Sequence, residues 1–139
     1  YRSITDWIKE YESFVAKKHI NRFVAIGFSV GAYIIACSNV KPDLTIYASI
    51  SPLFKEDIKS WPKQITKVLG KKRISTIGKY NKKPNSVFLI GEREDKSMFN
   101  TTYRLSSSGK TTVKIIKNAG HDISYKTYLD TIVKLLQNK

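Results

Sequence analysis

The fold of this chain depends on the stretch GFSVG at Gly27–Gly31, which joins an apolar, β-branched run to a run of helical character. The first run, FVAI at Phe23–Ile26, is typical of a buried strand, and the second, AYIIAC at Ala32–Cys37, is typical of a helix. A glycine stands two residues before and two residues after Ser29, where we expect a side chain to clash as the backbone turns sharply. The pattern predicts a tight strand–turn–helix unit that exposes the serine hydroxyl.

A serine in such a turn becomes a nucleophile only if the chain also supplies a base and an acid. The backbone N–H of Val30 would stand at a helix N-terminus, where unpaired donors and the helix dipole favour an oxyanion. The strand-like run at Val113–Lys117 leads into NAGHD, which places His121 in a loop after a strand. A third run, at Ser86–Ile90, leads into the acidic loop GERED at Gly91–Asp95. The candidate groups therefore follow the chain order serine, acid, histidine.

From Arg22 to its C-terminus, the chain resembles the second half of an α/β hydrolase, on these three motifs and their order. GFSVG resembles the nucleophile elbow of that family, GERED its acid loop, and AGH at Ala119–His121 its histidine loop before the last helix. The resemblance implies that Ser29 is the nucleophile and that His121 is the general base and later the general acid. It also implies that a carboxylate of the acid loop fixes the tautomer of the imidazole.

Two adjacent carboxylates compete for the role of the acid. The family commonly places it three residues after the loop glycine, which is Glu94 here, whereas aspartate is the more usual side chain and stands one step later as Asp95. The preferred assignment is Asp95, with Glu94 as the alternative and Glu92 as a remote third. The implied reaction cleaves an ester, thioester or related acyl bond of a small molecule through an acyl-enzyme, with the Val30 N–H as one oxyanion donor and the second donor unidentified.

The succession of runs predicts a single α/β domain over residues 1–139, with three α/β/α layers and a short, mostly parallel sheet of about four strands. A helix is expected over about Thr5–Lys18 and a further strand over Thr45–Ile50. A complete α/β hydrolase is longer, so the resemblance implies that its first strands have no counterpart here. The strand at Phe23–Phe28 would then have an open edge, where we expect a second copy of the chain or a missing N-terminal segment.

The connection from Ser51 to Pro84 is too long for a simple turn. Because the family often carries a cap or lid at this position, we expect a cap-like insertion over residues 52–84. Its Phe54 and Trp61, together with Phe28 of the elbow, are the candidate substrate-binding side chains. Ordinary packing in the core explains Phe54 and Trp61 at least as well.

The positive charge of the chain is also compatible with a different class of function, the binding of an anionic partner. The sequence has 25 Lys and Arg against 11 Asp and Glu, a formal net charge of +14, and basic side chains are dense over Lys63–Lys83. Such a surface can hold phosphates or an anionic membrane. The sequence has no recognisable nucleic-acid-binding module, so binding of nucleic acid is the less favoured interpretation. The alternatives to a hydrolase are a catalytically inactive protein of the same fold, serving in binding, and a basic surface binder.

Other chemistries have little support in the sequence. One cysteine, Cys37, permits no intrachain disulfide, and two distant histidines make no metal site. No glycine motif for nucleotides follows a strand, so we expect no cofactor. No apolar run approaches twenty residues and no signal peptide is visible, so we expect no membrane span and a cytoplasmic location.

Overall fold

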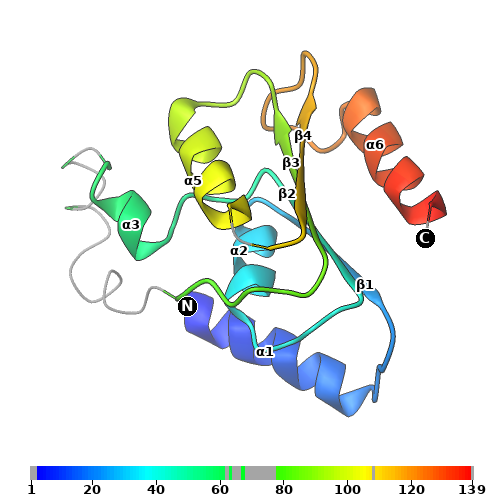
Figure 1. The fold of residues 1–139 in the computed structure, drawn as a ribbon. Helices are drawn as coiled ribbons and strands as arrows, with labels where there is room; N and C mark the ends of the chain where they lie inside the picture. The colour runs from blue at the N-terminus through cyan, green and yellow to red at the C-terminus, as the bar shows by residue number, and fades with distance from the viewer. Residues whose placement is uncertain (1–2, 62, 64–66, 68–77, 108, 139) are drawn as a thin grey trace.

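A computed structural model describes residues 3–61, 63, 67, 78–107 and 109–138 of the chain. Its centre is one sheet of four parallel strands in the order β1-β2-β3-β4, which run over Val24–Phe28, Leu44–Ala48, Ser86–Gly91 and Thr111–Ile116 (Figure 1). The described helices are α1 (Ile4–Lys17), α2 (Val30–Cys37), α3 (Lys55–Ile58), α5 (Lys96–Ser106) and α6 (Lys126–Gln137). The predicted α/β class and the parallel four-stranded sheet are confirmed.

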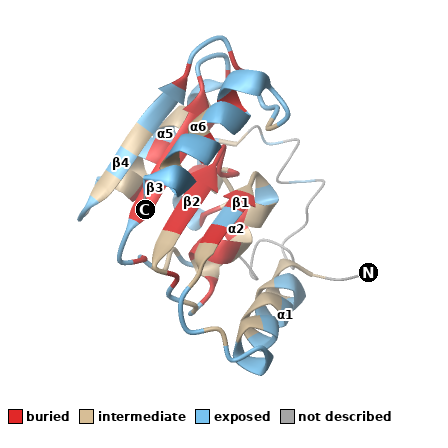
Figure 2. Ribbon diagram, turned by 90° about the vertical axis from the view of Figure 1, so that its right-hand side faces the viewer, coloured by how far each residue is buried: buried red, intermediate tan, exposed pale blue. Residues whose placement is uncertain are grey.

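Each face of the sheet has its own core, because successive strand residues point to opposite faces. On one face, α1, α2 and α5 cover a core that includes Tyr33, Tyr47 and Phe88 (Figure 1). On the other face, α6 packs Tyr128 and Ile132 against the strands (Figure 2). The helices therefore make two layers around the sheet, and α6 is the described helix of the second layer.

The first strand forms an edge of the sheet, as the sequence predicts. Among the described residues β1 pairs with β2 alone, and Ile26 in its middle is 41% exposed. The other edge is β4, where Ile115 is 50% exposed. What covers the β1 edge, whether a second copy or another segment, stays a prediction.

The helix α5 was not expected from the sequence. Its buried residues are Met98, Thr101, Thr102 and Leu105, so half of its inner face is threonine and the apolar pattern is weak. The helix begins directly after Asp95, whose side chain accepts a hydrogen bond from the backbone N–H of Met98. Since Asp is a preferred helix-capping residue, this contact explains where α5 starts.

The connection after β2 is described in part. Its first turn, α3, is tied to α5 by the buried carboxylate of Asp57, which binds Arg104 through both oxygens, at 2.6 and 3.1 Å, and accepts from Thr101 at 2.7 Å. Residues 62, 64–66 and 68–77 of the expected cap lie outside the described residues. The cap-like insertion over 52–84 therefore stays a prediction, while its first turn is fixed against the domain.

Candidate active site

Ser29 occupies a sharp turn between β1 and α2. Its φ of 56° and ψ of −119° form a conformation that residues with a side chain rarely adopt. The turn is held by the Ser29 N–H, which donates to the carbonyl of Ala48 at 2.9 Å, and by the Tyr33 N–H, which donates to the Ser29 carbonyl at 3.2 Å. The serine thus stands at the carboxyl end of β1 with Val30, the first residue of α2, directly behind it.

The two glycines of GFSVG have different surroundings. A Cβ on Gly27 would lie 2.6 Å from the backbone nitrogen of Ala32 and 2.7 Å from its Cα, so β1 and α2 approach too closely for any side chain there. A Cβ on Gly31 would meet nothing within 4 Å among the described residues. The expected clash is therefore correct for Gly27 and wrong for Gly31, which faces a groove between α1 and β1.

A chain of side-chain contacts runs from Ser29 into the interior. The Oγ of Ser29 lies 3.0 Å from Nε2 of His121, and Nδ1 of His121 lies 2.6 Å from Oε1 of Glu94. The side chain of His121 is 43% exposed, whereas that of Glu94 is fully buried. A nucleophile, a base within hydrogen-bond reach and a group that orients the base are the parts that acyl transfer requires.

The loop GERED presents Glu94 to the histidine. The Glu94 N–H donates to the Gly91 carbonyl at 3.1 Å, and Oε2 of Glu94 accepts from the Gly91 N–H at 2.7 Å. Ser49, just after β2, donates its hydroxyl to the same Oε2 at 2.6 Å. The carboxylate therefore has donors on both of its oxygens, as a buried charge needs.

Asp95 makes different contacts. Its Oδ1 accepts from the Met98 N–H and from the Ser97 hydroxyl, and the Ser97 hydrogen bond is the main cause that lowers its pKa. These hydrogen bonds are those of a helix cap, whereas the hydrogen bond to His121 is made by Glu94. This geometry replaces Asp95 by Glu94 as the candidate acid. Glu92 is exposed, and its N–H donates to the carbonyl of Ile116.

A second hydroxyl, which no sequence motif indicates, lies beside the candidate nucleophile. The Oγ of Ser51 lies 3.1 Å from the Oγ of Ser29, and the Ser51 N–H donates to the Ser29 carbonyl at 3.3 Å. Ser51 is 7% exposed and follows the end of β2, two residues after Ser49. No motif marks either serine, because what brings them to the site is the register of β2 beside β1 and β3.

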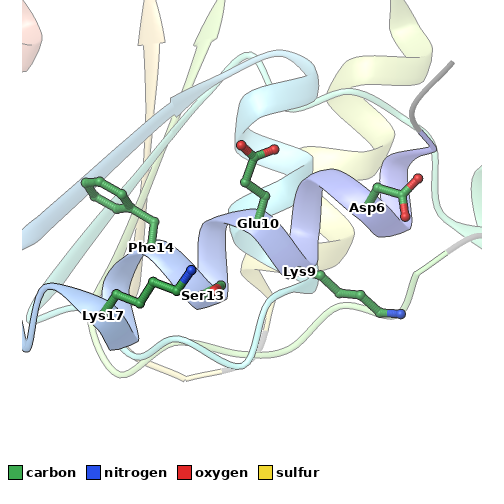
Figure 3. Close-up of a pocket in the computed structure, with 6 residues that line it drawn as sticks. All are labelled: Asp6, Lys9, Glu10, Ser13, Phe14 and Lys17. Carbon is green, nitrogen blue, oxygen red and sulfur yellow. The ribbon is translucent and has the colours of Figure 1, made fainter.

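A cavity of about 450 Å³ opens over these groups. It is lined by Ser29, Ser51, Arg93, Asp95, Met98 and His121, among others. The cavity shown in Figure 3 is a different one, formed along α1 by Asp6, Lys9, Glu10, Ser13, Phe14 and Lys17. It holds no residue of the three motifs, so the cavity over Ser29 is the candidate substrate site.

The three candidate substrate-binding residues, Phe28, Phe54 and Trp61, do not line this cavity. The ring of Phe28 packs against the ring of His121, with centroids 4.7 Å apart. Phe54 is 2% exposed and packs on Tyr33 in the core. Trp61 donates its indole N–H to the carbonyl of Pro52, which does line the cavity. Phe54 therefore packs in the core, whereas Phe28 contacts His121 and Trp61 contacts Pro52, two residues that line the cavity.

Two further properties bear on the class of protein. Within the described ranges, no group of three or more His, Cys, Asp or Glu side chains could hold a metal ion. Over the same residues, no helix is long and apolar enough to cross a membrane.

Comparison with known proteins finds likeness in structure rather than in sequence. No protein-family model matches the chain, and no curated protein is similar enough to count as a relative. Among solved structures, it is similar to an α/β hydrolase from the metagenome of lagoon sediments of Mar Chica, Morocco, with a TM-score of 0.68 and 14% identity over 98% of this chain and 68% of that one. MenH from S. aureus matches with a TM-score of 0.67 and 14% identity, over 98% of this chain and 76% of that one.

The chain has the fold of part of an α/β hydrolase. An α/β hydrolase from Novosphingobium aromaticivorans is also similar, with a TM-score of 0.59 and 15% identity over 99% of this chain and 73% of that one. Over these three structures and two further ones described as hydrolases, the match covers between 61% and 76% of the length of the other protein. At 12–15% identity the likeness concerns the fold alone.

Proposed function

We propose that this chain is a serine hydrolase that cleaves an ester, thioester or related acyl bond of a small molecule. The observation that carries the proposal is the contact chain from Ser29 Oγ to His121 Nε2 at 3.0 Å and from His121 Nδ1 to Glu94 Oε1 at 2.6 Å. The α/β-hydrolase-like fold and the cavity over Ser29 support it.

The proposed reaction has two steps. Ser29 Oγ attacks the carbonyl carbon while its proton passes to His121 Nε2, and the imidazolium is stabilised by Glu94 at Nδ1. His121 then returns the proton to the departing alcohol or thiol, which leaves an acyl group on Ser29. A water molecule, deprotonated by His121, attacks the acyl carbon and releases the acid.

The oxyanion formed in each step needs donors at the mouth of the cavity. Val30 is the first residue of α2, so its N–H precedes the hydrogen-bonded pattern of the helix and lies at the positive end of the helix dipole. Val30 follows Ser29 directly in the sequence, after the strained turn. The Val30 N–H is therefore the first proposed oxyanion donor.

The test compares labelling of Ser29 by a fluorophosphonate and hydrolysis of p-nitrophenyl acetate in matched variants. We expect Ser29→Ala to abolish labelling and His121→Ala to lower both rates by several orders of magnitude. Glu94→Gln should reduce turnover by roughly 10²- to 10⁴-fold, because it removes the charge that orients and stabilises the imidazole. Asp95→Asn, one residue later, distinguishes the two candidate acids and should reduce turnover far less than Glu94→Gln does.

Other outcomes would reassign the protein. Turnover that persists in Ser29→Ala would contradict the hydrolase proposal, and an unlabelled protein would favour an inactive member of the fold that serves in binding. The charge of +14 favours one further candidate, a basic surface binder of nucleic acid or anionic lipid. That function predicts strongly salt-dependent binding that survives Ser29→Ala.

A further inference from the structure

The carboxylate of Glu94 is in contact with a buried pair of hydroxyls on the side away from His121. Its Oε2 accepts from Ser49 Oγ at 2.6 Å, and Ser49 Oγ in turn lies 2.7 Å from the hydroxyl of Tyr128. Both hydroxyl-bearing residues are 0% exposed. They come from separate elements, since Ser49 follows β2 and Tyr128 belongs to α6 on one face of the sheet (Figure 2).

Counting protons gives this network a direction. An ionised carboxylate only accepts, so Ser49 gives its one proton to Glu94 and must accept from Tyr128. The other acceptor within reach of Tyr128 is the carbonyl of Leu89, which is farther away at 3.2 Å. Burial raises the pKa of Tyr128 well above its usual range, so its proton stays available. The donors therefore point in series from Tyr128 through Ser49 toward Glu94.

We propose that Ser49 and Tyr128 are positioning residues that keep Glu94 ionised and aimed at His121. This inference rests on the proposed function, because it concerns the acid of that same site. A carboxylate whose side chain is fully buried lacks direct contact with bulk water, so its charge depends on protein donors. Without the Ser49 hydroxyl, the donor to Oε2 that the structure still provides is the Gly91 N–H.

The backbone at Ser49 argues for the same role. Its φ is 47°, in the left-handed region that favours glycine, while its N–H donates to the Leu89 carbonyl at 2.8 Å. A glycine would fit this conformation with less strain, so the serine is disfavoured locally. Its hydroxyl contact with Glu94 accounts for a serine here. The same fact supplies a clean variant, because Ser49→Gly removes the hydroxyl and relieves the backbone at once.

The first measurement is the pH dependence of fluorophosphonate labelling and of p-nitrophenyl acetate hydrolysis between about pH 5 and pH 9. Losing a donor to the charged form makes protonation of the site easier, so the acid limb of the profile should move to higher pH. We expect a move of about one pH unit and a roughly tenfold lower rate near neutral pH in Ser49→Gly. Tyr128→Phe should move the limb in the same direction by less, since Tyr128 acts through Ser49.

The double variant tests whether the two hydroxyls act in series. If Tyr128 works only through Ser49, the double variant should behave like Ser49→Gly alone, because the effects of groups in one network do not add. Among the described residues, the ionisable side chains that line the same cavity as Glu94 are those of Arg93, Asp95 and His121. All three are unchanged in these variants, so the shift reports on the hydroxyls.

A second measurement does not need activity. The ring protons of His121 can be titrated by NMR, with His19→Gln to assign the two histidines of the chain. Because the donors on Oε2 set how well Glu94 keeps its charge beside the imidazole, we expect the pH dependence of the His121 ring resonances to change in Ser49→Gly. Tyr47→Phe is the matched control, because it removes a buried tyrosine hydroxyl from the opposite core and should change neither measurement.

The outcomes separate this inference from the proposed function. Ser29-dependent labelling with an unchanged acid limb and an unchanged His121 titration in Ser49→Gly would overturn the positioning role, whatever happens to stability. Absence of labelling in the parent protein, together with a shifted His121 titration in Ser49→Gly, would refute the hydrolase and leave the positioning role supported.

Discussion

Ser51 places a hydroxyl 3.1 Å from the Oγ of Ser29, on the atom that would attack the substrate. It can donate to Ser29 before the attack or to the oxyanion after it. Since removal of one oxyanion donor commonly costs two to three orders of magnitude, we expect Ser51→Ala to lower kcat of ester hydrolysis by roughly 10- to 1,000-fold. A trifluoromethyl ketone, which forms a tetrahedral adduct with a nucleophilic serine, should bind more weakly by a similar factor.

A matched control is available at the end of α5. Ser107 donates its hydroxyl to the carbonyl of Arg104 and is exposed, so Ser107→Ala should leave kcat and inhibitor binding unchanged. Unchanged ketone binding in Ser51→Ala with a lower kcat would show that Ser51 orients Ser29 rather than stabilising the oxyanion. Unchanged values for both would contradict any part for Ser51 in the reaction.

The sequence identified Ser29 and His121 as candidates because each stands in a motif after an apolar run. It led us to prefer Asp95 over Glu94 as the acid, because the directions in which two adjacent loop residues point are set only when the turn forms. The Glu94 N–H closes that turn onto the Gly91 carbonyl, and Asp95 becomes the cap of α5. Recognition of Asp95 as the cap of a helix would have favoured Glu94 as the candidate acid. Ser49 carries no comparable signal, because β-sheet register brings it to Glu94.

At the level of elements, the junction of β1 and α2 depends on one glycine and not on the other. Gly27→Ala places a Cβ 2.6 Å from the backbone of Ala32, so we expect a loss of roughly 1–3 kcal/mol in the free energy of unfolding and much slower labelling of Ser29. Gly31→Ala has open space and a helical position, so it should raise stability by up to about 1 kcal/mol.

Urea unfolding of the two variants gives the comparison directly. Both make the same chemical change within four residues of each other, so their difference isolates the contact between strand and helix. Equal losses of stability would contradict the close approach at Gly27 as its cause.

The strands were predictable as elements because each is an apolar run between turn residues. The helix α5 was not, because Thr101 and Thr102 occupy its buried face and dilute the apolar pattern. What secures α5 is a set of polar contacts, chiefly from Thr101 and Arg104 to the buried Asp57. The local pattern of apolar residues cannot predict such contacts, because they join segments more than forty residues apart in the sequence.

For the whole molecule, the sequence predicted the fold class and the number of strands. It did not predict how unequally the helices are distributed over the two faces of the sheet. α1, α2 and α5 share one face, and α6 is the helix described on the other (Figure 2). Exposed apolar side chains gather near the β1 edge, at Trp7, Phe14 and Ile26. An apolar edge of this kind is where we expect the predicted second copy or further segment to pair.

The stability of the whole molecule should depend on pH through Lys83. This lysine is 1% exposed, and its ammonium donates to the backbone carbonyl of Ser38 at the end of α2. Burial, with a smaller contribution from Lys41, lowers the pKa of Lys83 from 10.5 to about 8, although Cys37 and Glu12 oppose the shift. The charged form is therefore less favourable in the folded than in the unfolded chain.

The sign of the effect follows from proton counting. Below about pH 8 both states hold the proton and the folded state bears the full penalty, whereas between 8 and 10.5 the unfolded state binds more protons and stability rises. Relative to Lys83→Met, the parent protein should gain about 3 kcal/mol between pH 7 and pH 10.5. Burial raises the pKa of tyrosines such as Tyr33, so these residues lower the stability of both proteins at high pH. Their contribution cancels when the two free energies of unfolding are subtracted. Urea unfolding across this range tests it, with the exposed Lys134→Met as control, and a flat difference for Lys83→Met would show that the lysine carries no such penalty.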